Sequence, residues 1–353
     1  MLDYQKYYEV RMGWPGEKAL IKLGDLVSEG TGGAFAPWQI RRKARAEADA
    51  KRDELLILAQ TEQDIEDIKS GKKQYTEEHQ LITLCQEKVD EDQEAVIEQK
   101  GGRLEPYLDL EALDRQSSAR KQAQAIQEEI NFTKTVLLAE QELESGDYTA
   151  NDDPVDPDWF TRWRDSAEKV TNEELQKLWA KALAGEVTKP GSYSLRTLEF
   201  LKNLSQLEAE KISKLAPYVI GDFIYKLRCI EENGLSFEVL LEIEELGIIT
   251  GLTGGGLSQT MKSLDSSGFV QSFQYGGKIL IIKSDNPKQS LKLGGYKVTK
   301  LGEEILKLGV FPYNHKYLEE LGKSIKPQKF TVTIADITGF SSDKIHYANA
   351  RDL

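Results

Sequence analysis

The stretch 156–205 holds the side chains best suited to acid–base chemistry. Its carboxylates Glu173, Glu174 and Glu186 could in principle transfer protons. Arg196 is the remaining charged residue of interest, and no nucleophile or metal ligand accompanies the group. We therefore expect Glu186 and Arg196 to form a structural ion pair and predict no catalytic residue.

Signals for a metal or a cofactor are weak. His79, His315 and His346 are scattered, and none pairs with a cysteine or another histidine at ligand spacing. The glycine-rich segment 253–256 could cradle an anion before a helix, but the Lys-Ser that completes a phosphate loop is missing. We read this segment as a flexible turn. The sequence thus predicts a protein that is not an enzyme, with no cofactor and no metal site.

Residues 156–205 also predict a compact unit of three helices. Asp156 and Asp158 flank Pro157, which favours a helix start. Thr171 and Glu174 have the spacing of a capping box for a second helix, which Gly185 ends or loosens, and Ser192 or Ser194 would cap the third. Apolar residues repeat at helical spacing along this stretch. We expect three of them to be core residues instead of a ligand platform: Trp159, Trp163 and Trp179.

The most specific pattern here is Pro190-Gly-Ser-Tyr-Ser-Leu-Arg-Thr-Leu198, together with Asp158-Trp159, Gln176-Lys-Leu-Trp179 and Leu183-Ala-Gly-Glu186. These residues resemble a bacterial family known only as domain of unknown function 2806. The resemblance covers residues ~110–309, with its core at 156–205. A more distant similarity to helical abortive-infection proteins implies a role in defence against phage.

Upstream of this unit the chain favours long helices, over about 38–70, 76–100 and 109–145. In the third, apolar residues alternate steps of three and four, which is typical of a helix–helix seam. The candidate oligomer seam consists of Ala123, Ile126, Ile130 and Leu137. We expect self-association, most simply as a dimer.

Residues 14–45 combine an amphipathic helix, an aromatic loop and a basic cluster. Such a segment could lie on a membrane surface. The candidate contacts are Trp38, Arg41, Arg42 and Lys43. We favour the alternative, in which this helix docks on the rest of the protein.

Residues 235–309 predict the order helix, helix, hairpin, helix, which is the pattern of a winged-helix domain. Its recognition helix would be Leu257–Leu264, and a strand at 330–334 could extend the wing. The candidate nucleic-acid contacts are Gln259, Lys262 and Lys278. Because so few cations face the presumed DNA, we expect this domain to dock protein.

The chain has 353 residues and a net charge of −13, which disfavours a protein that coats nucleic acid or anionic membrane over its whole surface. Cys85 and Cys229 are far apart and are expected to be reduced and buried. The chain shows no signal peptide and no transmembrane run, so we expect a cytoplasmic protein.

The predicted fold class is mainly α: long antiparallel helices and a tryptophan-rich helical unit, followed by a small α+β winged-helix-like domain. The predicted divisions are 1–145 (long helices), 146–155 (linker), 156–220 (helical core unit) and 221–353 (winged-helix-like domain with a C-terminal strand). The leading functional hypothesis is a non-enzymatic, self-associating interaction protein, which could serve in anti-phage defence as a sensor or with a partner protein. The alternatives are a winged-helix DNA-binding regulator and a membrane-surface effector.

Overall fold

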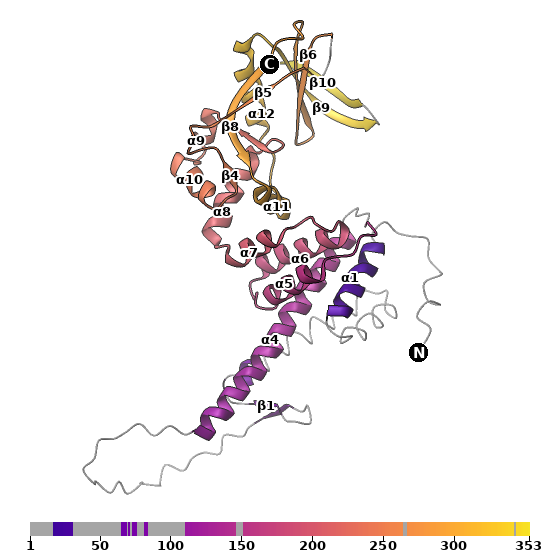
Figure 1. The fold of residues 1–353 in the computed structure, drawn as a ribbon, viewed down its shortest axis with the longest axis vertical. Coiled ribbons are helices and arrows are strands. Elements are labelled where there is room, and N and C mark those ends of the chain that lie inside the picture. Colours follow the sequence, from indigo (N-terminus) through magenta and orange to yellow (C-terminus); the bar gives the residue numbers. More distant parts are fainter. Residues whose placement is uncertain are drawn as a thin grey trace, which may run out of the picture. The chain divides into compact units, whose positions relative to one another are not determined.

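The computed structural model describes residues 17–30, 65–68, 70, 73–75, 81–83, 110–145, 151–263, 267–341 and 344–353. They belong to two compact units, Met1–Pro190 and Gly191–Leu353 (Figure 1). The boundary falls inside the helical core unit that the sequence predicts for residues 156–220.

In the part of the first unit that the structure describes, the regular elements are helices and one small hairpin. Its elements are α1 (Glu17–Gly30), β1 (Lys73–Tyr75), β2 (Leu81–Thr83), α4 (Leu110–Ser145), α5 (Pro157–Ala167) and α6 (Glu173–Thr188), and residues 65–68 are also helical. The long helix predicted for 109–145 is α4, and α1, α5 and α6 contact it (Figure 1). The helix predicted for 76–100 is wrong where the structure describes it, because Leu81–Thr83 pairs with Lys73–Tyr75 in an antiparallel hairpin.

Polar side chains cap these helices close to the predicted positions. Asp156 accepts a hydrogen bond from the Asp158 backbone N–H and begins α5. The cap of α6 is Asn172, which accepts from the Leu175 N–H, so the prediction of Thr171 was one residue off. Gly185 does not end this helix, which continues to Thr188. Because asparagine and threonine can both cap a helix, only the backbone geometry decides which of the two neighbouring residues is the N-cap.

The tryptophans lie in the core of the first unit. Trp163 has no exposed surface, and its indole N–H donates to the Trp179 carbonyl oxygen at 2.9 Å. Phe160 stacks on Trp163, and Phe132 of α4 meets it edge-on. Trp159 is also buried. This cluster joins α4, α5 and α6, and it offers no accessible aromatic face to a ligand.

The seam of α4 is covered within the first unit. Ile65 and Ile68 form one apolar cluster with Ala123 and Ile130, and Ile126 packs against it. Leu137 is buried as well. The seam that motivated self-association is therefore occupied by the chain itself over Ala123–Ile130.

The second unit combines helices with two antiparallel sheets. Its helices are α7 (Leu195–Asn203), α8 (Gln206–Leu215), η2 (Ala216–Tyr218), α9 (Arg228–Glu232), α10 (Phe237–Glu245), α11 (Lys300–Leu308), α12 (His315–Ile325) and η3 (Lys326–Gln328). Its strands are β3 (Phe223–Tyr225), β4 (Ile249–Thr250), β5 (Leu257–Met261), β6 (Phe269–Tyr275), β7 (Lys278–Ser284), β8 (Leu291–Val298), β9 (Thr331–Ser341) and β10 (Lys344–Asp352).

One sheet has the order β10-β9-β7-β6, and in the other β3, β4 and β5 all pair with β8. β7 carries the run Ile279–Ile282, which is buried on both faces of its sheet. Leu280 meets α12 at Gly322, where a Cβ atom would lie 2.9 Å from the Leu280 Cδ1 atom. Ile279 and Ile281 form a separate cluster with Ala335. Burial on both sides explains the unbroken apolar run.

The mainly α class with a winged-helix domain was wrong. Of the described residues, 54% are helical and 21% lie in strands, so the fold is mixed. The predicted recognition helix is absent, because Leu257–Met261 is strand β5, paired with β8 from Leu257↔Gly295 to Met261↔Leu291. The hairpin at Tyr275-Gly-Gly was predicted correctly, as was a strand near residue 331. Spacing of apolar residues cannot separate a short helix from a short strand, and the partner strand decides.

Candidate functional site

An open groove lies at one end of the β10-β9-β7-β6 sheet. Its volume is about 560 Å³, within the range of ~300–1,000 Å³ of ligand sites. We call it the aromatic groove, and its lining is Val219, Gly221, Gln274, Tyr275, Gly276, Gly277, Tyr313, Ile337, Thr338, Gly339 and Phe340. The lining contains no charged residue, which favours an uncharged ligand segment.

The β6–β7 turn builds one wall of the aromatic groove. Gly276 and Gly277 have φ angles of +57° and +76°, which glycine adopts without strain. Tyr313 lies directly on Gly276, where a Cβ atom would be 2.4 Å from the Tyr313 Cγ atom. The Tyr275 hydroxyl donates to the Pro217 carbonyl and accepts from the Asn314 N–H at 2.8 Å. These contacts hold the turn, η2 and the segment before α12 in place.

Strand β9 builds the opposite wall. It pairs with β7 only as far as Asp336↔Lys278, and the Ile337 N–H then donates to the Gly277 carbonyl at 2.8 Å. From Gly339 to Ser341 it pairs with β10, so within the described residues this end of β9 has no strand on its β7 side. An open strand edge of this kind can pair with an extended peptide.

The aromatic groove contains exposed rings and polar side chains that are available to bind a ligand. Tyr313 is 63% exposed and Phe340 is 69% exposed. Among the described residues, the side chains of Gln274 and Thr338 find no hydrogen-bond partner. The aromatic rings can bury apolar groups, and the amide and the hydroxyl can bond a peptide backbone. The arrangement is chemically suited to recognition.

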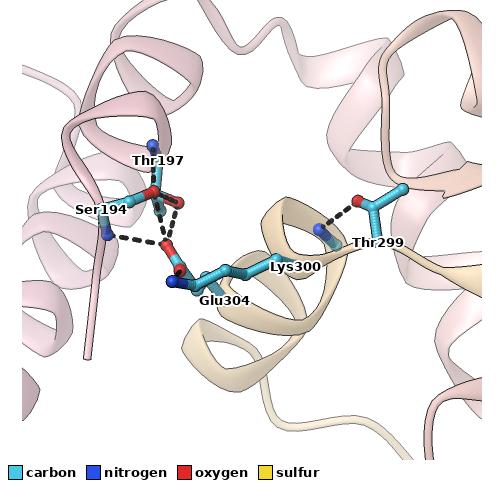
Figure 2. Close-up of polar contacts among 6 residues, drawn as sticks. Ser194, Thr197, Thr299, Lys300 and Glu304 are labelled. Atoms are coloured by element: carbon cyan, nitrogen blue, oxygen red, sulfur yellow. Dashed lines mark hydrogen bonds and ion pairs between the residues drawn. The ribbon is translucent and has the colours of Figure 1, made fainter. Parts of the chain in front are cut away.

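A second cluster of polar groups surrounds Glu304 of α11 (Figure 2). One oxygen, Oε2, accepts from the Ser194 N–H at 2.7 Å, from the Ser194 hydroxyl at 2.9 Å and from the Thr197 hydroxyl. Lys300 lies 4.0 Å from the other oxygen. Ser194 is the N-cap of α7, one of the two caps proposed from sequence. Glu304 is only 3% exposed, so this carboxylate joins α11 to the start of α7 and is not placed to meet a substrate.

The backbone of the glycine-rich segment 251–256 binds the carboxylate of Glu244, which belongs to the same unit. The two oxygens of Glu244 accept from the Leu252 N–H at 2.7 Å and from the Thr253 N–H at 3.0 Å. Burial by itself raises the pKa of Glu244, but these backbone donors outweigh it and hold the pKa below its ordinary value. The Leu252 and Thr253 N–H groups are therefore used within the second unit and are not left for an external anion.

The predicted nucleic-acid contacts do not share one surface element. Gln259 of β5 accepts from the Tyr225 hydroxyl, and Lys262 follows the end of that strand. Lys278 forms an ion pair with Asp336 at the groove end of β7. With the recognition helix absent, they no longer form the surface that the prediction assumed.

The charged residues of the 156–205 stretch are dispersed. Glu173 and Glu174 lie in the exposed first turn of α6, where Glu174 pairs with Lys177 at 2.7 Å. Glu186 is buried in the first unit. Arg196 belongs to the second unit and lines a smaller pocket of about 320 Å³ with Phe200 and other residues. The predicted ion pair between Glu186 and Arg196 stays a prediction.

Several residues singled out from the sequence lie outside the described part, and others lie within it. The candidate membrane contacts Trp38, Arg41, Arg42 and Lys43, and also Cys85, lie outside the described residues. Cys229 is buried, and burial raises its pKa to about 12. Over the described residues, no cluster of side chains could hold a metal ion, and no helix is long and apolar enough to cross a membrane.

Sequence reasoning missed the aromatic groove. It identified the Tyr275-Gly-Gly turn but had no reason to bring Tyr313 and Phe340 beside it, since these residues come from a loop and a distant strand. The available signal was weak: an apolar segment Val310–Tyr313 between two helices.

Comparisons with known proteins identify one similarity. Neither a curated protein nor a solved structure matches the chain. Residues 114–221 match the family DUF2806, described as a protein of unknown function. The match contains the core 156–205 on which the resemblance was inferred, and it spans α4 to the start of the second unit. The resemblance of this chain to the DUF2806 family is thus confirmed over residues 114–221.

Proposed function

We propose that this chain is a non-enzymatic interaction protein that binds an extended peptide segment of a partner protein in the aromatic groove. The observation that carries the proposal is the open end of β9, flanked by Tyr313 and Phe340. A peptide lying there would pair its backbone with β9 and place apolar side chains against the two rings.

The charge of the groove supports an uncharged peptide. The lining contains no Asp, Glu, Lys, Arg or His, and the neighbouring Lys278 and Asp336 neutralise each other. Acidic or basic side chains would lose hydration in this groove without gaining a partner. The preferred segment is therefore apolar or aromatic at alternate positions, as the two-residue repeat of a strand requires.

The test is selection of peptides of about twelve residues from a random displayed library on the full chain, followed by anisotropy measurements with the selected peptides. Tyr313→Ser and Phe340→Ser should each weaken binding at least tenfold, because truncating an aromatic anchor costs about 2 kcal/mol. Phe237→Ser and Leu207→Ser are matched controls, since these side chains are 54% and 68% exposed outside the groove. Equal loss in the controls, or no selected peptide, would refute the proposal.

A role in anti-phage defence and self-association are finer proposals that rest on the sequence. If the groove serves defence, expression of the wild-type chain should reduce phage plaque formation, and Phe340→Ser should restore it. Self-association would require a surface other than the part of the α4 seam that Ile65 and Ile68 cover. Light scattering should then give a mass above 39.8 kDa.

A further inference from the structure

Exposed lysines gather at the end of the second unit that lies opposite the aromatic groove along β7 and β9. They come from the residue after β5, the end of β7, the β7–β8 connection, the start of β8 and the α12–β9 connection. We call them the basic end: Lys262, Lys283, Lys288, Lys292, Lys326 and Lys329. They are spread over nearly seventy positions of sequence, so only the fold gathers them.

Pairing and side-chain hydrogen bonds establish that these segments are neighbours. Lys283 of β7 lies opposite Thr331 at the start of β9, close to Lys329. The Gln328 side chain accepts from the Lys292 N–H and donates to the Lys292 carbonyl, which joins η3 to β8. Gln271 of β6 pairs with Ile282, the neighbour of Lys283, and its side chain donates to the Lys262 carbonyl. The lysines therefore share one end of the unit.

Within the described residues, no carboxylate comes within ion-pair distance of these lysines. Lysines elsewhere in the unit do find partners, including Lys211, Lys278 and Lys297. The acidic residues nearest along the chain are Asp265, which lies outside the described residues, and Asp285. Asp352 lies opposite Thr333 of β9 and accepts from its hydroxyl. Basic and acidic residues nearly balance over Gly191–Leu353, so the net charge of −13 comes mostly from residues 1–190. A positive potential at this end is thus not cancelled by its own unit.

We propose that the basic end binds the phosphate backbone of nucleic acid without sequence selectivity. Lysine is a point charge suited to phosphate, and the side chains that could read bases, Gln289 and Gln328, are already bonded to their neighbours in the unit. None of the large exposed apolar side chains of the described residues lies in these segments. A membrane surface is therefore the poorer fit, because it is usually bound by cations together with apolar residues that insert.

The inference is separate from the proposed peptide groove. The aromatic groove lies where β7 begins and β9 ends, and the basic end lies where β7 ends and β9 begins. A change in one site should leave the other unaffected. Each proposal can consequently fail alone.

The test is anisotropy of a labelled random 20-base-pair duplex with the full chain, titrated at several salt concentrations. The logarithm of the binding constant should fall with the logarithm of salt by about 0.9 for each phosphate contacted. The triple variant Lys283→Glu, Lys288→Glu and Lys292→Glu should bind at least tenfold more weakly and show a shallower slope. The milder triple variant with glutamine should flatten the slope similarly with a smaller loss of affinity.

The matched control is Lys214→Glu, Lys307→Glu and Lys316→Glu, which makes the same charge change at exposed sites away from the basic end. Thermal melting verifies that each variant is folded. If the control variant weakened duplex binding equally, net charge alone would explain the effect, and the proposal would be overturned. Binding to vesicles with phosphatidylserine but not to the duplex would also overturn it, as would no salt-dependent binding at all.

Discussion

Replacing Glu304 by alanine should destabilise the second unit strongly, although no surface is altered. The carboxylate is the acceptor for the Ser194 N–H and for the hydroxyls of Ser194 and Thr197 (Figure 2). Removing it leaves the buried Thr197 hydroxyl and the half-buried Ser194 donors without their acceptor, and each unsatisfied group costs about 1–3 kcal/mol.

The magnitude follows from how many donors can find another acceptor. The Ser194 and Thr197 hydroxyl oxygens are 3.2 Å apart, so one can donate to the other after the substitution. The Ser194 N–H and the remaining hydroxyl then stay unsatisfied. Lys300 adds little, because its side chain is 82% exposed and its charge is screened by water. We expect a loss of about 3 kcal/mol, the sum for two donors left unsatisfied at about 1–3 kcal/mol each.

Hydrogen exchange measured by mass spectrometry suits this test, because it separates the two units. Loss of about 3 kcal/mol should lower the protection of α7 and α11 amides roughly a hundredfold, at about 1.4 kcal/mol for each factor of ten. All five tryptophans lie in residues 1–190, so tryptophan fluorescence reports the first unit and should not change.

Two further variants make the experiment decisive. Glu303→Ala changes the neighbouring residue in the same helical turn and should cost less than about 1 kcal/mol. Glu304→Gln retains one acceptor oxygen and should give an intermediate loss. If Glu304→Ala left the protection of α7 within a factor of three of wild type, the structural role assigned to this carboxylate would be refuted.

Three other outcomes are expected. Gly295→Ala should destabilise the second unit by several kcal/mol, since the new Cβ would lie 2.0 Å from the Ile224 carbonyl oxygen. Gly294→Ala, whose nearest contact is at 3.9 Å, should be tolerated when both variants are compared by thermal melting. Trp179→Ala should lower the stability of the first unit by about 3–5 kcal/mol, measured by urea unfolding, and an unchanged midpoint would contradict its role in the core. The Glu244 carboxylate has a pKa lowered in the folded state, so its stabilisation is complete above the ordinary value of 4.5 and is lost as the pH falls through the folded pKa. Thermal melting between pH 6 and about pH 3 should therefore show a smaller acid-induced loss for Glu244→Gln than for wild type, and identical pH dependence would contradict this assignment.

Much of the local structure of the helical part could be predicted from sequence. The long helix α4, the start of α5 at Asp156 and the cap of α7 at Ser194 follow from short-range patterns, because a capping side chain bonds a backbone N–H two or three residues away. The same holds for the Gly276-Gly277 turn. The error at Thr171 shows the limit of this reasoning, since its neighbour Asn172 has equal capping ability and occupies the position.

The second unit was harder to predict because its strands depend on distant partners. The segment Leu257–Met261 fits a short helix or a short strand equally well by its apolar spacing, and its pairing with β8 decides the matter. β8 itself contains Gly294 and Gly295, which are poor strand formers, and Gly295 is needed because the Ile224 carbonyl approaches it closely. Gly295 is therefore unfavourable for a strand by its local propensity, but the sheet requires it.

The sequence alone determined the start of α5 at Asp156, the tryptophans as apolar repeats and the resemblance to DUF2806, because all of these depend on neighbouring residues. Only the tertiary structure decided the sites. It joined Tyr313 and Phe340 to the Gly276-Gly277 turn, it placed Glu304 under the first turn of α7, and it gathered the lysines of the basic end from separate strands. Each of these arrangements depends on strand register and helix packing between residues far apart in the chain, and a one-residue change of register would move every side chain to the other face.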